Sequence, residues 1–359
     1  MTRTAALPAP SAARTTSEAV RPDVLTLDEV LARAPGAYRV LTGDRPTGAL
    51  HVGHLFGTLA TRVELQRHGV DTVVVIADYQ VITDRDDPGD VRAAVREVVL
   101  DYLAAGLDPE ATTVFVHSDV PALHQLMLPF LSLVSVAELD RNPTVKAEQA
   151  ASGRALSGLL LTYPVHQAAD VLSTGGTLVP AGRDQLPHLE LTRTVARRFN
   201  RRYGRTFVEP AALLSRAPLV LGTDGSKMSK SRGNAIELRA DADATAAAVR
   251  GAVTDPERTI TYEPERRPEV ANLLLIGALA AGCTPQDVAD EIGTGGAAGL
   301  KRFVTDALVA HLAPLRARRA ELARDPAVVP EVLARGAARA ADLAEGTLDR
   351  VRDAMGRVR

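Results

Sequence analysis

Cysteine, tryptophan and lysine are scarce in this sequence of 359 residues. A single cysteine, Cys283, excludes an internal disulfide and any cysteine-rich zinc site, and it favours a reducing, cytoplasmic location. Tryptophan is absent, and aromatic residues make up only 3% of the chain. No apolar run reaches the roughly 18 residues that a membrane-spanning helix needs, so we expect no membrane partner.

Charge of one sign does not dominate either, because 42 lysine and arginine residues face 44 acidic ones. This balance excludes a chain coated in basic residues, although a local basic face remains possible. Only four of the 42 basic residues are lysine, and two of them, Lys227 and Lys230, lie three positions apart. Chance placement on a surface loop is one interpretation; a pair kept as lysine for its chemistry is the other.

The pattern of apolar residues divides the chain into three parts. Residues 1–36 are rich in Ala, Pro, Thr and Ser without an apolar period, so we expect a disordered extension, and they contain no apolar core of a secretory signal. Residues 37–238 alternate apolar strands with amphipathic helices. The expected strands are 37–43, 71–78, 112–118 and 177–182, and the expected helices about 50–66, 89–106, 121–140, 157–173 and 185–203.

This alternation predicts an α/β fold with a doubly wound, Rossmann-like parallel sheet. Ligands of such sheets bind at the carboxyl ends of the strands. Residues 239–359 show helical patterns only, and they form the expected all-helical C-terminal domain. Six arginines on and after the helix 185–203 either face solvent or contact nucleic-acid phosphates: Arg193, Arg197, Arg198, Arg201, Arg202 and Arg205.

The chain contains neither a Walker loop nor GxGxxG. Instead, the first expected strand leads into the string GDRPTGALHVGH at 43–54. Gly43 and Gly48 permit tight turns, and the following helix start offers free N–H groups to an anion. His51 and His54 are expected on one helix face, with Gly53 between them. A nucleotide base could lie on this glycine while the imidazoles reach phosphate oxygens, although a histidine pair alone is often just surface.

The second string, GTDGSKMSKSRGN at 222–234, is a polar, glycine-rich loop that contains Lys227 and Lys230. Two ammonium groups on such a loop can close over a polyphosphate and offset the negative charge that builds up during transfer at phosphorus.

The two strings together resemble the signatures of class I aminoacyl-tRNA synthetases, since HVGH is similar to HIGH and KMSKS is the second signature. Their separation fits the smaller subclass that charges tryptophan and tyrosine, and the similarity is greatest to tryptophanyl-tRNA synthetases. It covers nearly everything from about residue 39 to the C-terminus. Further matching stretches are IADYQVITD (76–84), DYLAAGLDP (101–109), NPTVKAE (142–148), YPVHQAAD (163–170), VPAGRDQLPHLELTRTVARRFN (179–200) and KMSKSRGNAIEL (227–238).

The resemblance implies ligation of L-tryptophan to tRNA(Trp) through an aminoacyl-adenylate, with ATP and ATP-bound Mg²⁺, in a homodimer, and without a dedicated protein metal site. It implies catalytic roles for His51, His54, Lys227 and Lys230. It implies ATP contacts from Arg45, Pro46, Thr47, Gly53, His54, Gly182, Arg183, Asp184, Leu219, Lys227, Met228, Ser229, Lys230 and Ser231. The helical domain would bind the tRNA anticodon.

The predicted amino-acid site also has an argument from spacing. Tyr163, Gln167 and Asp170 fall at i, i+4 and i+7, so they share one helix face. The resemblance implies that Asp170 accepts a hydrogen bond from the indole N–H and that Tyr163 and Gln167 bind the α-ammonium group of the amino acid. It also implies that Gln80 belongs to the tryptophan-binding site. A capped helix with a solvated acid is the plainer interpretation.

Tyrosine remains the second candidate substrate, because its hydroxyl can also donate to Asp170. A tRNA-independent nucleotidyltransferase or a non-catalytic paralogue would also fit parts of the sequence, although the first would not need the helical domain. Three residues depart from the family pattern: Gln80 replaces a histidine of another branch, Arg183 an expected acid, and Leu41 an aromatic. These departures motivate the hypothesis of an analogue-tolerant second isozyme.

Overall fold

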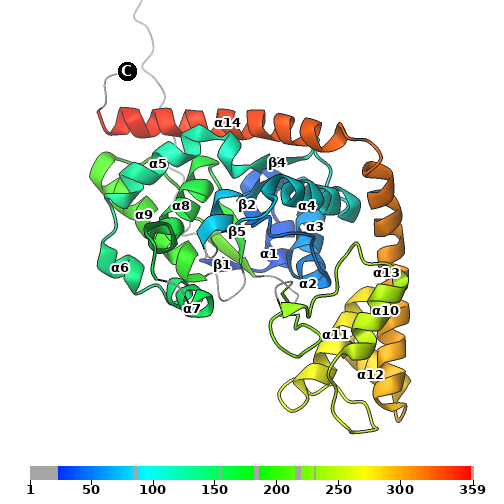
Figure 1. The fold of residues 1–359 in the computed structure, drawn as a ribbon. Coiled ribbons are helices and arrows are strands. Elements are labelled where there is room, and N and C mark those ends of the chain that lie inside the picture. Colours follow the sequence, from blue (N-terminus) through cyan, green and yellow to red (C-terminus); the bar gives the residue numbers. More distant parts are fainter. Residues whose placement is uncertain are drawn as a thin grey trace, which may run out of the picture.

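A six-stranded parallel sheet forms the centre of the computed structural model, which describes residues 23–83, 87–153, 155–181, 186–214, 220–229 and 232–356 (Figure 1). The strand order is β1-β6-β5-β2-β3-β4. The strands are β1 (Val24–Leu25), β2 (Arg39–Asp44), β3 (Asp71–Ile76), β4 (Thr112–Val116), β5 (Leu178–Ala181) and β6 (Ala211–Leu214). The doubly wound α/β fold predicted from the sequence is therefore confirmed.

Helices cover both faces of the sheet because β2, β3 and β4 are apolar on both sides. The helices of the sheet region are α1 (Leu27–Leu31), α2 (Val52–His54), α3 (Ala60–Arg67), α4 (Val91–Ala105), α5 (Pro121–Leu131), α6 (Val136–Asp140), α7 (Pro143–Ser152), α8 (Gly158–Ser173) and α9 (Leu186–Tyr203), with a π-helical turn at Leu55–Leu59. Short 3-10 turns follow β3 (Tyr79–Thr83) and β4 (His117–Asp119). One core joins α3 and α4 to the sheet, and a second joins α5, α8 and α9 to its other face.

The chain order reverses between β2 and β5, since β3 and β4 follow on one side and β6 on the other. Such a switch point opens a crevice at the carboxyl ends of the two strands, where doubly wound sheets bind ligands.

Residues 23–36 differ from the predicted disordered extension. β1 pairs in parallel with β6, and α1 begins with a capping box in which Thr26 and Glu29 bond reciprocally. Leu25, Leu27 and Val30 are buried against β2 and β6. The prediction was wrong for this stretch because five residues of helix and two of strand are too short to show a period; residues 1–22 lie outside the described part of the chain.

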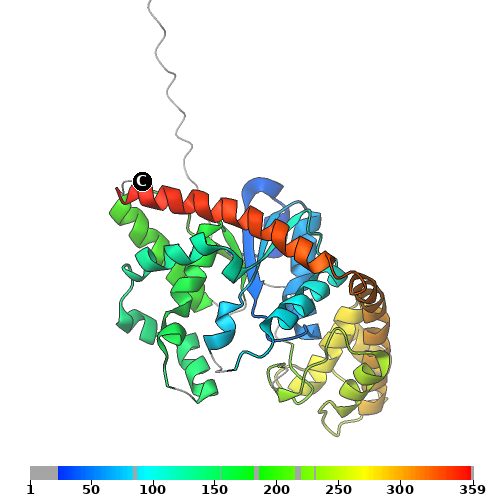
Figure 2. The ribbon, with the colours of Figure 1, turned by 45° about the horizontal axis from the view of Figure 1, so that its top comes forward.

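The C-terminal residues are helical as predicted: α10 (Ala242–Gly251), α11 (Pro268–Ala281), α12 (Pro285–Ile292), α13 (Gly296–Leu322) and α14 (Val328–Ala354). They do not form one unit, however. α10 to α13 make a lobe that packs through α13 on α4, whereas α14 runs back along β4 and α5 (Figures 1 and 2). The predicted boundary at residue 239 therefore separates the lobe but not α14 from the sheet.

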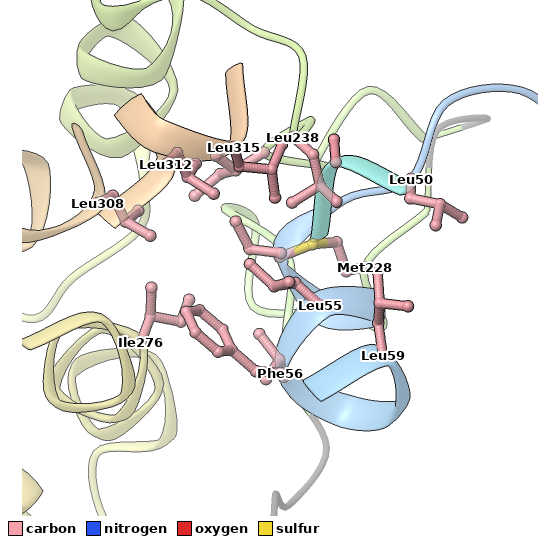
Figure 3. Packing of buried hydrophobic residues seen from close by; sticks show 14 of the residues in the cluster. Leu50, Leu55, Phe56, Leu59, Met228, Leu238, Ile276, Leu308, Leu312 and Leu315 are labelled. Carbon is pink, nitrogen blue, oxygen red and sulfur yellow. The ribbon is translucent and has the colours of Figure 1, made fainter. Parts of the chain in front are cut away.

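The lobe and the first crossover share one core. Leu308, Leu312 and Leu315 of α13 face the π-helical turn, and Met228 lies beside Leu55 (Figure 3). None of the helices in the described ranges is, by itself, long and apolar enough to cross a membrane; α11 and α12 reach that length and composition only together, with a bend of 106° between them.

Candidate active site

The first motif begins where β2 passes closest to β3. A Cβ atom on Gly43 would lie 2.4 Å from the carbonyl oxygen of Val75, so glycine is required at this position. The next residue, Asp44, accepts hydrogen bonds of 2.6 Å from Arg62 Nη1 and from the Tyr102 hydroxyl. Burial alone would raise the pKa of Asp44, but the charges of Arg62 and His54 and the hydrogen bonds from Arg62 and Tyr102 together hold this pKa well below the usual range.

His51 and His54 lie together, as predicted, although His51 precedes the helix as its N-cap instead of sharing a face. The His51 backbone N–H donates to His54 Nδ1 at 3.3 Å, and the ring centroids are 3.8 Å apart. Gly53 leaves no side chain between the His51 ring and Met228, since a Cβ there would lie 3.0 Å from the ring and 3.6 Å from Met228 Sδ. The two signature motifs are therefore in direct contact.

The second motif is held by the side chain of Asn234. Its Oδ1 accepts from the Ser229 backbone N–H at 2.8 Å, and its Nδ2 donates to Asp224 at 2.7 Å and to the Lys227 carbonyl at 3.2 Å. Gly222 is required beside it, because a Cβ would lie 2.3 Å from Asn234 Nδ2. This loop is thus ordered around Lys227 by one buried amide.

Backbone hydrogen bonds fasten the end of the second motif to the first. The Val52 N–H donates to the Ile236 carbonyl at 2.9 Å, and the Leu238 N–H donates to the Leu50 carbonyl at 3.0 Å. The structure therefore places Met228 beside Gly53, next to His51 and His54, while Lys227 and Ser229 adjoin Met228 on the same loop. Six predicted ATP contacts lie outside the described residues: Gly182, Arg183, Asp184, Leu219, Lys230 and Ser231.

A cavity of about 310 Å³ opens at the switch point, where Gly43, Asp44 and Arg45 of the first motif line it. None of His51, Gly53, His54 and the described residues of the second motif lines it. Tyr163, Gln167 and Asp170 of α8 all line it, which agrees with their predicted common face. Gln80 lines it from the turn after β3, and Arg45 from the turn after β2. Leu41, Val75, Val171 and Val179 supply apolar wall. Pro46 and Thr47 are not among the described residues that line it.

Two polar residues of this cavity, Tyr163 and Arg45, have partners in the surrounding structure. The Tyr163 hydroxyl lies 2.9 Å from His188 Nε2, and burial together with the nearby charge of Glu148 raises its pKa well above the usual range. Arg45 Nη2 lies 3.9 Å from Glu148. Tyr163 is therefore a neutral hydrogen-bonding group, beside a carboxylate that suits a ligand ammonium.

Three buried or half-buried imidazoles stand behind Asp170: His117, His124 and His166. His117 Nε2 lies 2.8 Å from Asp170 Oδ1. Sequence reasoning gave no role to these histidines or to Asp44, Arg62 and Tyr102. Asp44, Tyr102 and His166 do lie in the matched stretches, but their partners come from separate elements that meet only in the fold.

The arginines of α9 differ in exposure, since Arg193 is buried whereas Arg197, Arg201 and Arg202 are exposed. Arg193 is 3% exposed and donates to the Pro210 carbonyl at 2.7 Å. Arg197 pairs with Glu209 at 2.9 Å, and Arg198 pairs with Glu138 at 2.6 Å. These three side chains thus join α9 to its neighbours.

In comparison with known proteins, the family model of class I tRNA synthetases (W and Y) matches residues 34–312 of the sequence. The chain belongs to this family of class I synthetases. It is 40% identical over 331 residues to the tryptophan–tRNA ligase of Clostridium longisporum, covering 88% of this chain and 96% of the relative. The corresponding ligase of Treponema pallidum is 43% identical over 328 residues, with 89% and 96% covered.

Solved synthetase structures agree with the fold. The tryptophanyl-tRNA synthetase of Campylobacter jejuni, complexed with ADP and tryptophan, is 28% identical with a TM-score of 0.75, covering 89% of this chain and 99% of that one. The enzyme of Mycoplasma pneumoniae is 26% identical with a TM-score of 0.75, with 89% and 97% covered. This chain is therefore an aminoacyl-tRNA synthetase by family and by architecture.

Proposed function

We propose that this synthetase activates L-tryptophan with ATP and transfers it to tRNA(Trp), as the names of its curated relatives indicate for those proteins. The observation that carries the proposal is Asp170, a carboxylate only 4% exposed that borders the cavity. A buried acceptor favours a ligand that brings a donor, because an apolar ligand would leave the carboxylate oxygen that does not face His117 without a hydrogen bond. The indole N–H supplies this donor.

In the first step, an oxygen of the tryptophan carboxylate attacks the α-phosphorus of ATP, and the bond to the bridging oxygen of pyrophosphate breaks. Lys227 and Lys230 would offset the charge on the departing pyrophosphate, while His51, His54 and Gly53 would bind the nucleotide. Lys227 lies on the loop that contacts the first motif, which supports this assignment. Mg²⁺ would bind the ATP phosphates without a dedicated protein site.

In the second step, the 2′-hydroxyl of the terminal tRNA ribose attacks the adenylate carbonyl and AMP departs. No covalent enzyme intermediate is needed, so the protein acts by positioning and electrostatics. The remaining ATP contacts that we propose include Arg45, which borders the cavity, and Met228 and Ser229 in the second motif.

ATP–pyrophosphate exchange with tryptophan, tyrosine and phenylalanine tests the proposal. We expect exchange with tryptophan alone, and loss of about 10²-fold or more in kcat/KM on Lys227→Ala, since a charge opposite the leaving group is removed. Lys301→Ala is the matched control, because Lys301 Nζ donates to the Arg250 carbonyl in the helical lobe. Exchange with tyrosine instead would keep the mechanism and change the substrate, and no exchange would favour a non-catalytic binding protein.

We also propose a cytoplasmic homodimer with the tRNA bound in part by the helical lobe. Leu128 on α5 and Val136 on α6 support a dimer interface, because these apolar side chains are 74% and 69% exposed. Sedimentation of the wild-type protein and of Leu128→Glu tests this point: a dimer that the charge converts to monomer is expected, and a monomeric wild-type protein would contradict it.

A further inference from the structure

His117 occupies a site where the cavity wall meets the sheet. It follows β4 directly, is 0% exposed, and places Nε2 2.8 Å from Oδ1 of Asp170. The negative charge of Asp170 raises the pKa of His117 against the opposing effect of burial. The imidazole therefore gives the buried Asp170 side chain a partner of opposite charge, and an unpaired charge at this depth would be costly.

The two neighbouring imidazoles, His124 and His166, are hydrogen-bonded to each other. His166 Nδ1 lies 3.2 Å from Gln80 Nε2, and His166 Nε2 lies 2.8 Å from His124 Nδ1. Since an amide nitrogen only donates, His166 Nδ1 accepts, and the proton on its Nε2 is donated to His124. Burial lowers the pKa of His166 to about 4, so this chain of hydrogen bonds is neutral at neutral pH.

His166 also packs against His117. Their ring centroids are 4.1 Å apart with an interplanar angle of 30°, and the His124 ring lies 4.7 Å from that of His117. The neutral rings of His166 and His124 thus pack against the His117 imidazole and limit the directions in which its Nε2 can point.

We propose that His117 is a positioning residue for indole recognition: its Nε2 forms an ion pair with Asp170 Oδ1 at 2.8 Å, and with the amino acid bound its Nε2–H donates to Oδ1 and so orients Oδ2 toward the N–H of the ligand. This inference rests on the proposed function, in which tryptophan occupies the cavity. A carboxylate free to rotate would present either oxygen at many angles, whereas a hydrogen bond to one oxygen fixes the plane of both. His117 acts through Asp170 and does not touch the substrate.

The test compares tryptophan with its sulfur isostere, 3-(benzothiophen-3-yl)alanine, whose ring has no N–H. In ATP–pyrophosphate exchange we expect His117→Leu to lower the preference for tryptophan at least ~10-fold, because one buried, charge-assisted hydrogen bond is lost. The change should lie in KM for tryptophan, with kcat and the KM of the isostere altered less than ~3-fold. His117→Gln keeps an N–H donor and should restore most of the preference.

His124→Leu is the matched control, since it removes an imidazole of the same cluster that bonds to His166, whereas His117 forms the ion pair with Asp170. It should change the preference for tryptophan less than ~3-fold. Equal losses for tryptophan and the isostere in His117→Leu would make His117 a packing residue and overturn the proposal.

A second outcome would also overturn it. The three histidines place ligand atoms within 4.8 Å of one another, close enough to share a metal ion. If dialysis of the wild-type protein against a chelator abolished the preference and Zn²⁺ restored it, the histidines would act as metal ligands instead. A wild-type protein that fails to exchange with tryptophan at all contradicts the proposed function, which is a separate result.

Discussion

The buried imidazole of His166 makes the stability of the folded chain depend on pH in the acid range. Its pKa is lowered to about 4, mainly by burial, whereas an exposed histidine titrates near 6.5. Between these values the unfolded chain binds the proton and the folded chain does not. The free energy of unfolding therefore falls as the pH drops from about 6.5 to 4, by on the order of 3 kcal/mol from this residue.

Urea unfolding of wild type and His166→Gln between pH 7 and 4.5 checks this prediction. Wild type should lose more stability than the variant over this interval, because glutamine does not titrate. His68→Gln is the control, since His68 is exposed at the end of α3, and its pH dependence should follow wild type. Parallel curves for wild type and His166→Gln would contradict the assignment.

At the residue scale, the sequence predicted those site residues whose arrangement depends on a single helix. Tyr163, Gln167 and Asp170 could be found because seven residues of helix place them on one face. His117 could not, since its partnership with Asp170 depends on how β4 and α8 pack. The Asp44–Arg62 pair escaped for the same reason: a strand and a helix must meet before the charges do.

At the element scale, α14 depends on one glycine. A Cβ atom on Gly336 would lie 1.7 Å from the Val114 carbonyl oxygen, so α14 sits directly on the edge strand β4. Covering this edge also removes a row of backbone groups from unwanted pairing. Gly336→Ala forces the helix off the strand, and we expect a loss of at least ~3 kcal/mol in the free energy of unfolding.

Gly346→Ala provides the control on the same helix. A Cβ there meets only Arg350 Nη1, at 3.9 Å, and the residue is exposed. Alanine should stabilise by up to about 1 kcal/mol, because it is the better helix former. Denaturant unfolding of the two variants measures the difference; equal stabilities would contradict the close contact of α14 with β4.

The strands and helices were predictable to the extent that each carries a period of its own. β3 contains the apolar run from Val73 to Ile76, and α4 ends at a left-handed Gly106, so both were predicted nearly in place. The expected helix over 121–140 is two helices, because Ser135 and Glu138 form a capping box that starts α6. That signal was present in the sequence; the packing of α14 on β4 was not.

At the scale of the whole molecule, one buried carboxylate joins the helical lobe to the proposed nucleotide site. Asp101 of α4 is 0% exposed; its Oδ2 accepts from the Leu50 backbone N–H at 2.8 Å, and its Oδ1 from Arg319 Nε at 2.7 Å. Leu50 directly precedes the HVGH string, while Arg319 lies near the end of α13. Residues more than two hundred positions apart in the chain thus meet on one side chain, which no local pattern could predict.

Arg319→Leu should therefore affect both stability and ATP use. Burial already raises the pKa of Asp101, so removing its cationic partner leaves a costly carboxylate, and we expect a loss of about 3–5 kcal/mol in the free energy of unfolding. Since Asp101 holds Leu50, the KM for ATP in the exchange assay should rise by more than ~3-fold even in the folded fraction.

Asp101→Asn in the Arg319→Leu background separates charge from contact. A neutral amide can still accept from the Leu50 N–H without a charge to balance, so the double variant should regain much of the lost stability. Arg318→Leu, on the exposed neighbouring position, should leave both readouts within error of wild type. If Arg319→Leu lowers stability while the KM for ATP stays unchanged, Asp101 secures the lobe but does not connect it to the nucleotide site.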